Sequence, residues 1–275
     1  MILLHTLMLI LIEYWVTTRY TLSSISMTGI PVTNYQEILD VIGSWPNSDC
    51  NPYYYRGLKK DFSVIPSIAY PDTSQRLQAE ADFKSYEERT ITAFRNHLRD
   101  GFRIDTYELS DWNLWFLARH FGLKSRLTDF TKDFTIAFQF ATQMSGDSAC
   151  RIYCLNSAGI MHRLQNELGD PFSFNELCLI QPSLQYRETM EKIGVSRMFI
   201  QSGKFLHQSI KTVQTSLLEQ IKPEHWKVLE IQAKYFAVIR MELQSTFGID
   251  FTKPLAVSHV IDGICNHINQ SHLWH

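Results

Sequence analysis

The sequence predicts an α+β fold in a single domain. Segments with apolar residues at helical spacing alternate with short aromatic or alternating segments, so helices and strands are intermixed along the chain. Hydrophobic residues make up 45% of the 275 residues and charged residues 20%, which is enough for a core and excludes global disorder. There is no repeat and no linker longer than a loop, so we expect one domain over residues 28–268 and a tail at 269–275.

Helices are expected where apolar residues recur every three or four positions. Asp111 is a plausible N-cap for one of them, and Gly122 and Gly248 follow the ends of two. Asp100 and Gly101 are expected to end another. The expected helices are 35–45, 80–99, 111–121, 132–143 and 223–247.

Strands are expected where aromatic residues cluster between turn signals or where side chains alternate with a period of two. The run of three tyrosines and an arginine before Gly57 is one such segment. The expected strands are 53–56, 125–129, 149–155 and 196–205.

The first 12 residues are apolar, but Glu13 ends this run well short of the ~20 residues that span a bilayer. No basic residue precedes the run and no small-residue cleavage site follows it, as a signal peptide would require. We interpret residues 1–26 as an apolar segment upstream of the true start, with Met27 as the initiator. A short membrane anchor and a native capping helix are the alternatives.

Charge and cysteine usage narrow the class of protein. The net charge of −2 gives no strong signal for nucleic acid or for an anionic membrane surface. The five cysteines include no Cys-x-x-Cys pair, and the ten histidines show no metal-ligand spacing. We therefore expect a cytoplasmic protein with reduced thiols, no membrane span and no metal.

Three segments stand out because their order and spacing resemble the FRG domain family. The first is Tyr55-Arg56-Gly57, and the second, at 118–131, reads Ala-Arg-His-Phe-Gly-Leu-Lys-Ser-Arg-Leu-Thr-Asp-Phe-Thr before an Ala-Phe-Gln-Phe-Ala helix. The third runs from Arg197 through Gln201 to Phe205. The resemblance covers roughly residues 32–267. The chain departs from the family pattern at 119, where Arg replaces Gln, and at 124–125, 128 and 130.

The same segments have a weaker resemblance to the ADP-ribosyltransferase fold. That resemblance implies small split, mostly antiparallel sheets flanked by helices, with NAD in a cleft between them. It implies that Arg56 pairs with the pyrophosphate, that Gly57 lets the backbone approach the ligand, and that Gln201 bonds the nicotinamide ribose. The other expected ligand-binding residues are Tyr55, His120, Arg126, Asp129, Thr131 and Arg197.

The residue at 201 bears directly on catalysis. Breaking the glycosidic bond of NAD passes through an oxocarbenium-like state, which a fixed electrostatic environment stabilises. Gln201 can accept a hydrogen bond from the ribose but carries no charge. Glu188 and Glu191 lie shortly before it, in a segment that reads as helix or loop.

Structural roles are open for most of these residues. Arg56 can instead pair with a buried carboxylate such as Glu80 or Glu87, since a buried arginine needs a partner. Asp129 can cap a helix or hold Arg126 or Arg56. A helix C-terminus favours a charged imidazole at His120, Thr131 is a natural N-cap, and Gln201 can satisfy loop backbone.

Two functions are compatible with the motifs. One is a cytoplasmic enzyme that takes NAD as substrate and either hydrolyses it or transfers ADP-ribose to a macromolecular acceptor. The other is a non-catalytic module that binds a nucleotide or a protein in the same cleft. Phosphate-binding loops, dinucleotide-binding glycine motifs and nucleophile elbows are all absent from the sequence. A shared site requires Arg56, Asp129 and Gln201 to fall within one cleft about 10 Å across.

Overall fold

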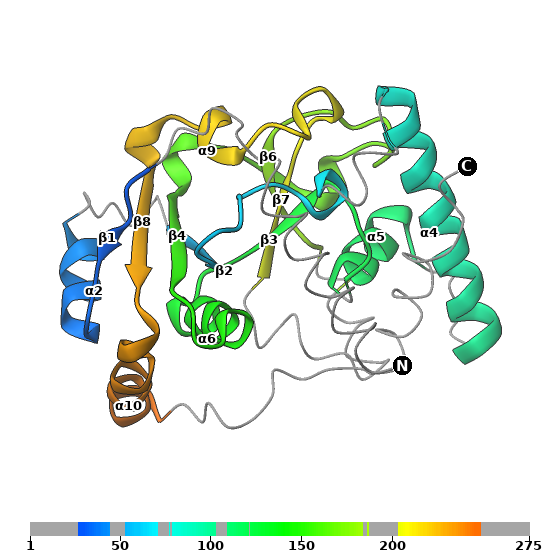
Figure 1. Cartoon of the computed structure of the whole chain (residues 1–275). Coiled ribbons are helices and arrows are strands. Elements are labelled where there is room, and N and C mark those ends of the chain that lie inside the picture. The colour runs from blue at the N-terminus through cyan, green and yellow to red at the C-terminus, as the bar shows by residue number, and fades with distance from the viewer. Residues whose placement is uncertain are drawn as a thin grey trace, which may run out of the picture.

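The computed structural model of the chain describes residues 27–44, 53–70, 77, 79–102, 109–120, 122–183, 186 and 203–248. Eight strands in this part of the chain form one sheet, in the order β1-β8-β4-β2-β3-β7-β6-β5 (Figure 1). All pairs are antiparallel except β1 with β8 and β5 with β6. The strands are β1 (Ile30–Pro31), β2 (Tyr53–Lys59), β3 (Leu127–Thr131), β4 (Cys150–Asn156), β5 (Met161–Leu164), β6 (Cys178–Gln181), β7 (Gly203–His207) and β8 (Trp226–Ile231).

Helices are spread along the sheet from one end to the other. Figure 1 shows α4 and α5 together at one end and α2 and α10 at the other, with α6 between them. The α-helices are α2 (Tyr35–Gly43), α4 (Glu80–Phe102), α5 (Asp111–His120), α6 (Phe134–Ser145), α9 (Leu217–Gln220) and α10 (Phe236–Phe247). The α+β class is therefore confirmed.

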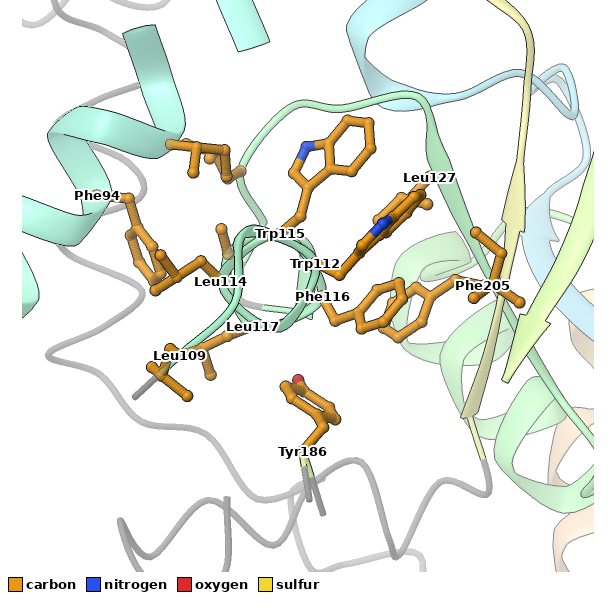
Figure 2. Packing of buried hydrophobic residues seen from close by; sticks show 14 of the residues in the cluster. Phe94, Leu109, Trp112, Leu114, Trp115, Phe116, Leu117, Leu127, Tyr186 and Phe205 are labelled. Carbon is orange, nitrogen blue, oxygen red and sulfur yellow. The ribbon is translucent and has the colours of Figure 1, made fainter. Parts of the chain in front are cut away.

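Helices α2, α4, α5, α6 and α10 cover the same face of the sheet. Helices α4 and α5 bury an aromatic cluster against β3, β6 and β7, in which Trp112, Trp115 and Phe116 radiate from α5 (Figure 2). Phe116 stacks on Phe205 of β7 with ring centroids 4.6 Å apart. Helices α2, α6 and α10 bury a second cluster against β2, β4 and β8. Side chains of the opposite face, among them Tyr54, Phe130 and Leu206, pack with α9 and loops.

The strands form one open sheet rather than the separate small sheets that the weaker resemblance implies, and no cleft between two sheets is seen among the described residues. The connection between β2 and β3 is nevertheless narrow. These strands share a single register pair, Tyr55 with Thr131, whereas β2 and β4 share seven pairs and β3 and β7 share five. Beyond Tyr55 the two strands diverge, and we call this place the β2–β3 gap.

The predicted helix over 223–247 is wrong in its first half. Residues Trp226–Ile231 form strand β8, and helix α10 begins only at Phe236. The apolar residues of this segment fit helical spacing and also alternate toward the two faces of a strand. Pairing with β4 along six residues satisfies the backbone there and decides between the two patterns. Strands β1, β5 and β6 were not predicted.

The other predicted helices are confirmed, with differences at their ends. Ser110 rather than Asp111 caps α5, because its hydroxyl accepts from the Asn113 amide at 3.2 Å. Helix α4 continues through Gly101 to Phe102. Gly122 and Gly248 have φ of 90° and 67°, as expected for residues that end a helix.

The strands predicted at 53–56, 125–129 and 149–155 correspond to β2, β3 and β4. The strand predicted at 196–205 corresponds to β7 from Gly203 onward, and its first seven residues lie outside the described residues. Residues 1–26 and the tail at 269–275 also lie outside them. None of the helices over the described residues is long and apolar enough to cross a membrane.

Candidate functional site

Strand β2 presents the Tyr55-Arg56-Gly57 motif to both faces of the sheet. Tyr55 points toward α6, where its ring meets Phe134 edge-on at 5.8 Å, and burial raises its phenol pKa. Gly57 also faces α6: a Cβ added there would lie 1.9 Å from the carbonyl oxygen of Ala137. The close backbone approach expected at Gly57 therefore exists, but it is made to a helix of the same chain.

Arg56 follows Tyr54 on the face of β2 that points away from α6. Its Nη1 donates to the main-chain carbonyl of Asp129 at 2.7 Å and lies 3.9 Å from the Asp129 carboxylate. The guanidinium thus spans the β2–β3 gap, where no ladder hydrogen bond joins the strands. Burial lowers the pKa of Arg56, and Tyr70 and Asp129 act in the opposite direction. The Arg56 guanidinium remains positively charged despite its burial.

A second guanidinium meets the same carboxylate from α5. Arg119 Nη2 lies 2.6 Å from Asp129 Oδ2, and Arg119 Nη1 donates to the Ser67 hydroxyl at 3.0 Å. Both arginine side chains are 12% exposed, and the Asp129 side chain is 39% exposed. Two positive charges therefore surround one negative charge at a partly buried place that solvent still reaches. We call Arg56, Arg119 and Asp129 the arginine cluster.

The arginine cluster retains unused donors. The Nε atoms of Arg56 and Arg119 are both buried without a hydrogen-bond partner in the described part of the chain. A buried donor without a partner costs about 1–3 kcal/mol. The net positive charge and these two donors make the cluster a candidate site for an anionic group.

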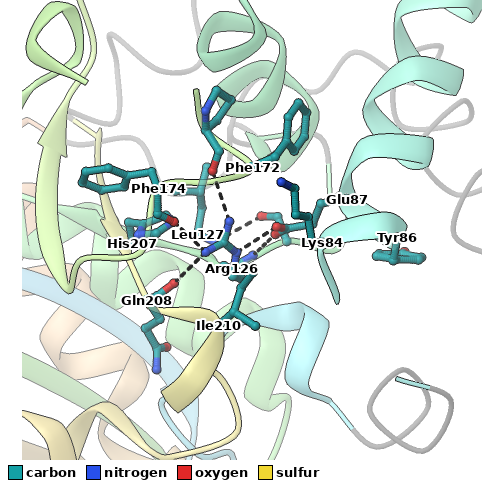
Figure 3. A network of polar contacts seen from close by, with 12 residues as sticks. Lys84, Tyr86, Glu87, Arg126, Leu127, Phe172, Phe174, His207, Gln208 and Ile210 are labelled. Carbon is teal, nitrogen blue, oxygen red and sulfur yellow. Dashed lines mark hydrogen bonds and ion pairs between the residues drawn. The ribbon is translucent and has the colours of Figure 1, made fainter. Parts of the chain in front are cut away.

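Arg126, also expected at the ligand, has a different environment (Figure 3). Its Nε donates to Glu87 at 2.8 Å, and both side chains are 0% exposed. Its Nη groups donate to the main-chain carbonyls of Pro171 and Phe174 at 3.1 and 3.0 Å. Burial raises the pKa of the Glu87 carboxyl, and Arg126 opposes this shift. These contacts favour a structural role for Arg126.

His207 lies beside Arg126 in the same buried network. Its Nδ1 is 2.7 Å from the carbonyl oxygen of Glu176, so the proton must be on Nδ1 because a carbonyl can only accept. Its Nε2 is buried without a partner in the described part of the chain. Burial and the charge of Arg126 hold the pKa of His207 well below its usual value, so the ring is neutral.

The N-cap of α6 is not the predicted residue, Thr131. Asp133, not Thr131, is the N-cap of α6, because its carboxylate accepts from the Thr135 amide at 2.8 Å. Thr131 accepts from the Asp133 amide at 3.0 Å and so supports the turn before the helix. Nothing in these contacts tests a ligand role for Thr131.

The structure brings Arg56 and Asp129 into contact, and it adds Arg119, which we had noted only as a departure from the family pattern. Of the two structural alternatives for Arg56, neither Glu80 nor Glu87 is its partner. Gln201, Arg197 and the side chain of His120 lie outside the described residues, as do Glu188 and Glu191. Arg56 and Asp129 are therefore in contact, whereas a cleft that they share with Gln201 stays a prediction.

Metal ligation has no support among the described residues, where no group of three His, Cys, Asp or Glu side chains is placed to hold an ion. Cys150, Cys154 and Cys178 are buried and unbridged. Burial raises the pKa of the Cys150 and Cys178 thiols to about 12, so neither is a reactive thiolate.

Comparison with known proteins identifies the region that carries these residues. Residues 51–149 match the model of the FRG domain family, so this part of the chain is similar to FRG domains. The matched region contains the whole arginine cluster and is narrower than the resemblance over residues 32–267. No curated protein and no solved structure matches the chain.

Proposed function

We propose that this FRG-like protein binds an anionic dinucleotide of the NAD type at the arginine cluster. The observation that supports the proposal is that two guanidiniums share one carboxylate, which gives the site a net positive charge. Arginine binds phosphate oxygens through its planar fork, and such charge-assisted bonds are about twice as strong as neutral ones.

Each residue of the cluster has a defined part in this proposal. Arg56 is fixed to β3 through the Asp129 carbonyl, so its charge is held in place before the ligand arrives. Arg119 is fixed to Asp129 and to Ser67. The pyrophosphate would share both guanidiniums with the more exposed Asp129, whose carboxylate keeps them apart and oriented.

The catalytic form of this proposal is cleavage of the glycosidic bond of NAD. Nicotinamide would be released, and ADP-ribose would be transferred to water or to a macromolecular acceptor. The alternative is binding without turnover, which is favoured by the uncharged Gln201 at the expected ribose position. Buried, unbridged Cys150, Cys154 and Cys178 support the expectation of a reducing compartment such as the cytoplasm.

The experiment is to titrate the full chain with NAD carrying a label in the nicotinamide ring, following both the melting temperature and released nicotinamide. A ligand that binds the folded state must raise the melting temperature. Arg119→Gln places the usual family residue at this position and should weaken NAD binding about tenfold, the loss of one charge-assisted bond. Arg99→Gln is the matched control, because Arg99 is exposed and contacts Asp100 on α4 rather than a residue of the arginine cluster.

Release of nicotinamide by the unmodified chain, lost in both Arg56→Lys and Gln201→Ala, would support the catalytic form of the proposal. Binding without release, weakened by Arg119→Gln, would support the binding module. Absence of any NAD-dependent stabilisation, or equal affinity in the Arg119→Gln and Arg99→Gln variants, would overturn the proposed function.

A further inference from the structure

Two phenylalanines in the described part of the chain are exposed, and they differ in what lies beside them. Phe62, in the loop after β2, is 40% exposed, and Phe247, the last residue of α10, is 54% exposed. The Phe62 ring meets Tyr70 edge-on, with ring centroids 6.3 Å apart. The Phe247 ring meets Tyr35 edge-on at 5.7 Å. A single exposed apolar residue is common on protein surfaces, so the surroundings of each ring decide what it can do.

Tyr70 connects Phe62 to the arginine cluster. The Arg56 guanidinium donates a hydrogen bond to the Tyr70 hydroxyl, so one tyrosine contacts both the Phe62 ring and Arg56. Phe247 and Tyr35 belong instead to α10 and α2, which lie at the end of the sheet opposite α5 (Figure 1). Of the two exposed rings, Phe62 is therefore the one beside the candidate anion site.

Main-chain hydrogen bonds hold Phe62 on both sides. Its amide donates to the Lys59 carbonyl at 3.1 Å, and its own carbonyl accepts from the Tyr153 hydroxyl at 3.4 Å. Tyr153 is the cross-strand partner of Arg56 in the ladder between β2 and β4. The position of Phe62 is thus fixed relative to Arg56, and an exposed ring on a fixed backbone loses little freedom when a ligand packs on it.

The turn that carries Phe62 adds no net charge to the site. Lys60 and Arg151 both pair with Glu230, at 2.7 and 3.0 Å. Asp61, which directly precedes Phe62, balances the remaining positive charge. The positive charge near the ring therefore comes from the arginine cluster.

A fixed, exposed aromatic ring beside two guanidiniums fits a ligand that carries a planar base close to phosphate groups. Any base can stack on a phenylalanine ring, because every base has a π-face. The guanidiniums bind phosphate oxygens through their planar forks. Inorganic pyrophosphate would use the arginines and leave the ring unused, so the ring distinguishes nucleotides from simpler anions.

We propose that Phe62 is the base-stacking residue of the arginine cluster and makes the site selective for nucleotides over inorganic anions of similar charge. This role rests on the proposed function, because it needs phosphate groups at Arg56 and Arg119. It assigns a residue to the recognition of the base, which the arginines do not contact when they hold the pyrophosphate. Stacking of one base on an aromatic side chain contributes about 5- to 150-fold in affinity.

The test compares the affinities of inorganic pyrophosphate, ADP-ribose and NAD for the full chain by isothermal titration calorimetry. Phe62→Leu keeps apolar bulk and removes the ring. We expect it to weaken NAD binding about 5- to 150-fold and to leave pyrophosphate binding unchanged, which would show that Arg56 is still in place. Phe62→Trp restores an aromatic ring and should keep the affinity for NAD.

The matched control is Phe247→Leu, which removes the other exposed ring that meets a tyrosine edge-on, and it should change none of the three affinities. ADP-ribose identifies the base. A loss of affinity for ADP-ribose as well as for NAD would assign the ring to adenine, whereas a loss for NAD alone would assign it to nicotinamide.

Failure of this role and failure of the proposed function give different results. If Arg119→Gln weakens pyrophosphate binding while Phe62→Leu leaves NAD affinity unchanged, the stacking role is overturned and the anion site stands. If pyrophosphate does not bind, or binds equally well to Arg119→Gln, the proposed function is overturned and the stacking role with it. Equal losses of NAD and pyrophosphate affinity in Phe62→Leu would also overturn the stacking role, because they would show that Phe62 only supports Arg56.

Discussion

Arg119 and Arg126 belong to the same sequence motif at 118–131, but their side chains have different environments. Arg126 and its partner Glu87 are fully buried, and carbonyls of two loop residues complete the guanidinium's contacts. Arg119 shares the half-exposed Asp129 with Arg56 and keeps a buried donor unpartnered in the described part of the chain. The satisfied arginine stabilises the fold, whereas the pair that shares a carboxylate is the pair that we propose to bind an anion.

The largest effect should come from Arg126→Met. It leaves the Glu87 carboxylate buried without its partner, which costs about 3–5 kcal/mol. Chemical denaturation measures the loss. The matched control is Arg163→Met, which breaks an exposed pair with Glu176 and should cost about 1 kcal/mol or less. Similar losses for both variants would contradict the contrast between buried and exposed arginines.

Gly57→Ala should have the next largest effect. The new Cβ would meet the Ala137 carbonyl and the Ala141 side chain, so β2 and α6 must move apart. Overpacking of this kind costs about 1–3 kcal/mol in the free energy of unfolding. Gly43→Ala is the control, because nothing lies within 4 Å of a Cβ there and alanine favours the helix. An unchanged free energy of unfolding in Gly57→Ala would contradict the close contact between β2 and α6.

Acid should destabilise the protein through His207. The native ring stays neutral because its pKa lies well below 6.5, while the unfolded chain binds a proton near that pH. Stability contributed by the neutral ring is therefore present above about pH 6.5 and lost as the pH falls, by about 1.4 kcal/mol per pH unit. Denaturation curves of wild type and His207→Gln between pH 7.5 and 5.5 measure this. Parallel losses in both would assign the acid sensitivity to other groups.

Arg119→Gln should have the smallest effect on stability, about 1 kcal/mol or less, because solvent screens the partly exposed Asp129. The effect of Arg119→Gln on NAD affinity should be larger than its effect on stability, as the proposed function requires. The two measurements together separate a ligand-binding arginine from a structural one. A loss of stability equal to that of Arg126→Met, with unchanged NAD affinity, would place Arg119 with the structural arginines.

Local signals predicted the helices well. The positive-φ glycines after α5 and α10 depend on neighbouring residues only, so the sequence contains the information. The N-cap of α5 was predicted one residue late, at Asp111 instead of Ser110. Strand β8 was misread because its apolar residues fit two periods, and only pairing with β4 distinguishes them. The short strands β5 and β6 have four residues each, too few for a periodic signal.

The site was only partly predictable for a related reason. The motif indicated that Arg56 and Asp129 belong together, and they are in contact. It did not distinguish Arg126 from them, because Glu87, which pairs with Arg126, lies 39 positions earlier, on helix α4. Arg119 was visible only as a departure from the family pattern, and its distance to Asp129 depends on how α5 packs against β3.

The β2–β3 gap has a consequence for how the sheet opens. One register pair joins the half containing β1, β8, β4 and β2 to the half containing β3, β7, β6 and β5. Amides of β2 that face the gap lack the ladder partners that protect those facing β4. We therefore expect hydrogen exchange to divide the sheet into two protected units with an early-exchanging boundary, which the guanidinium of Arg56 bridges.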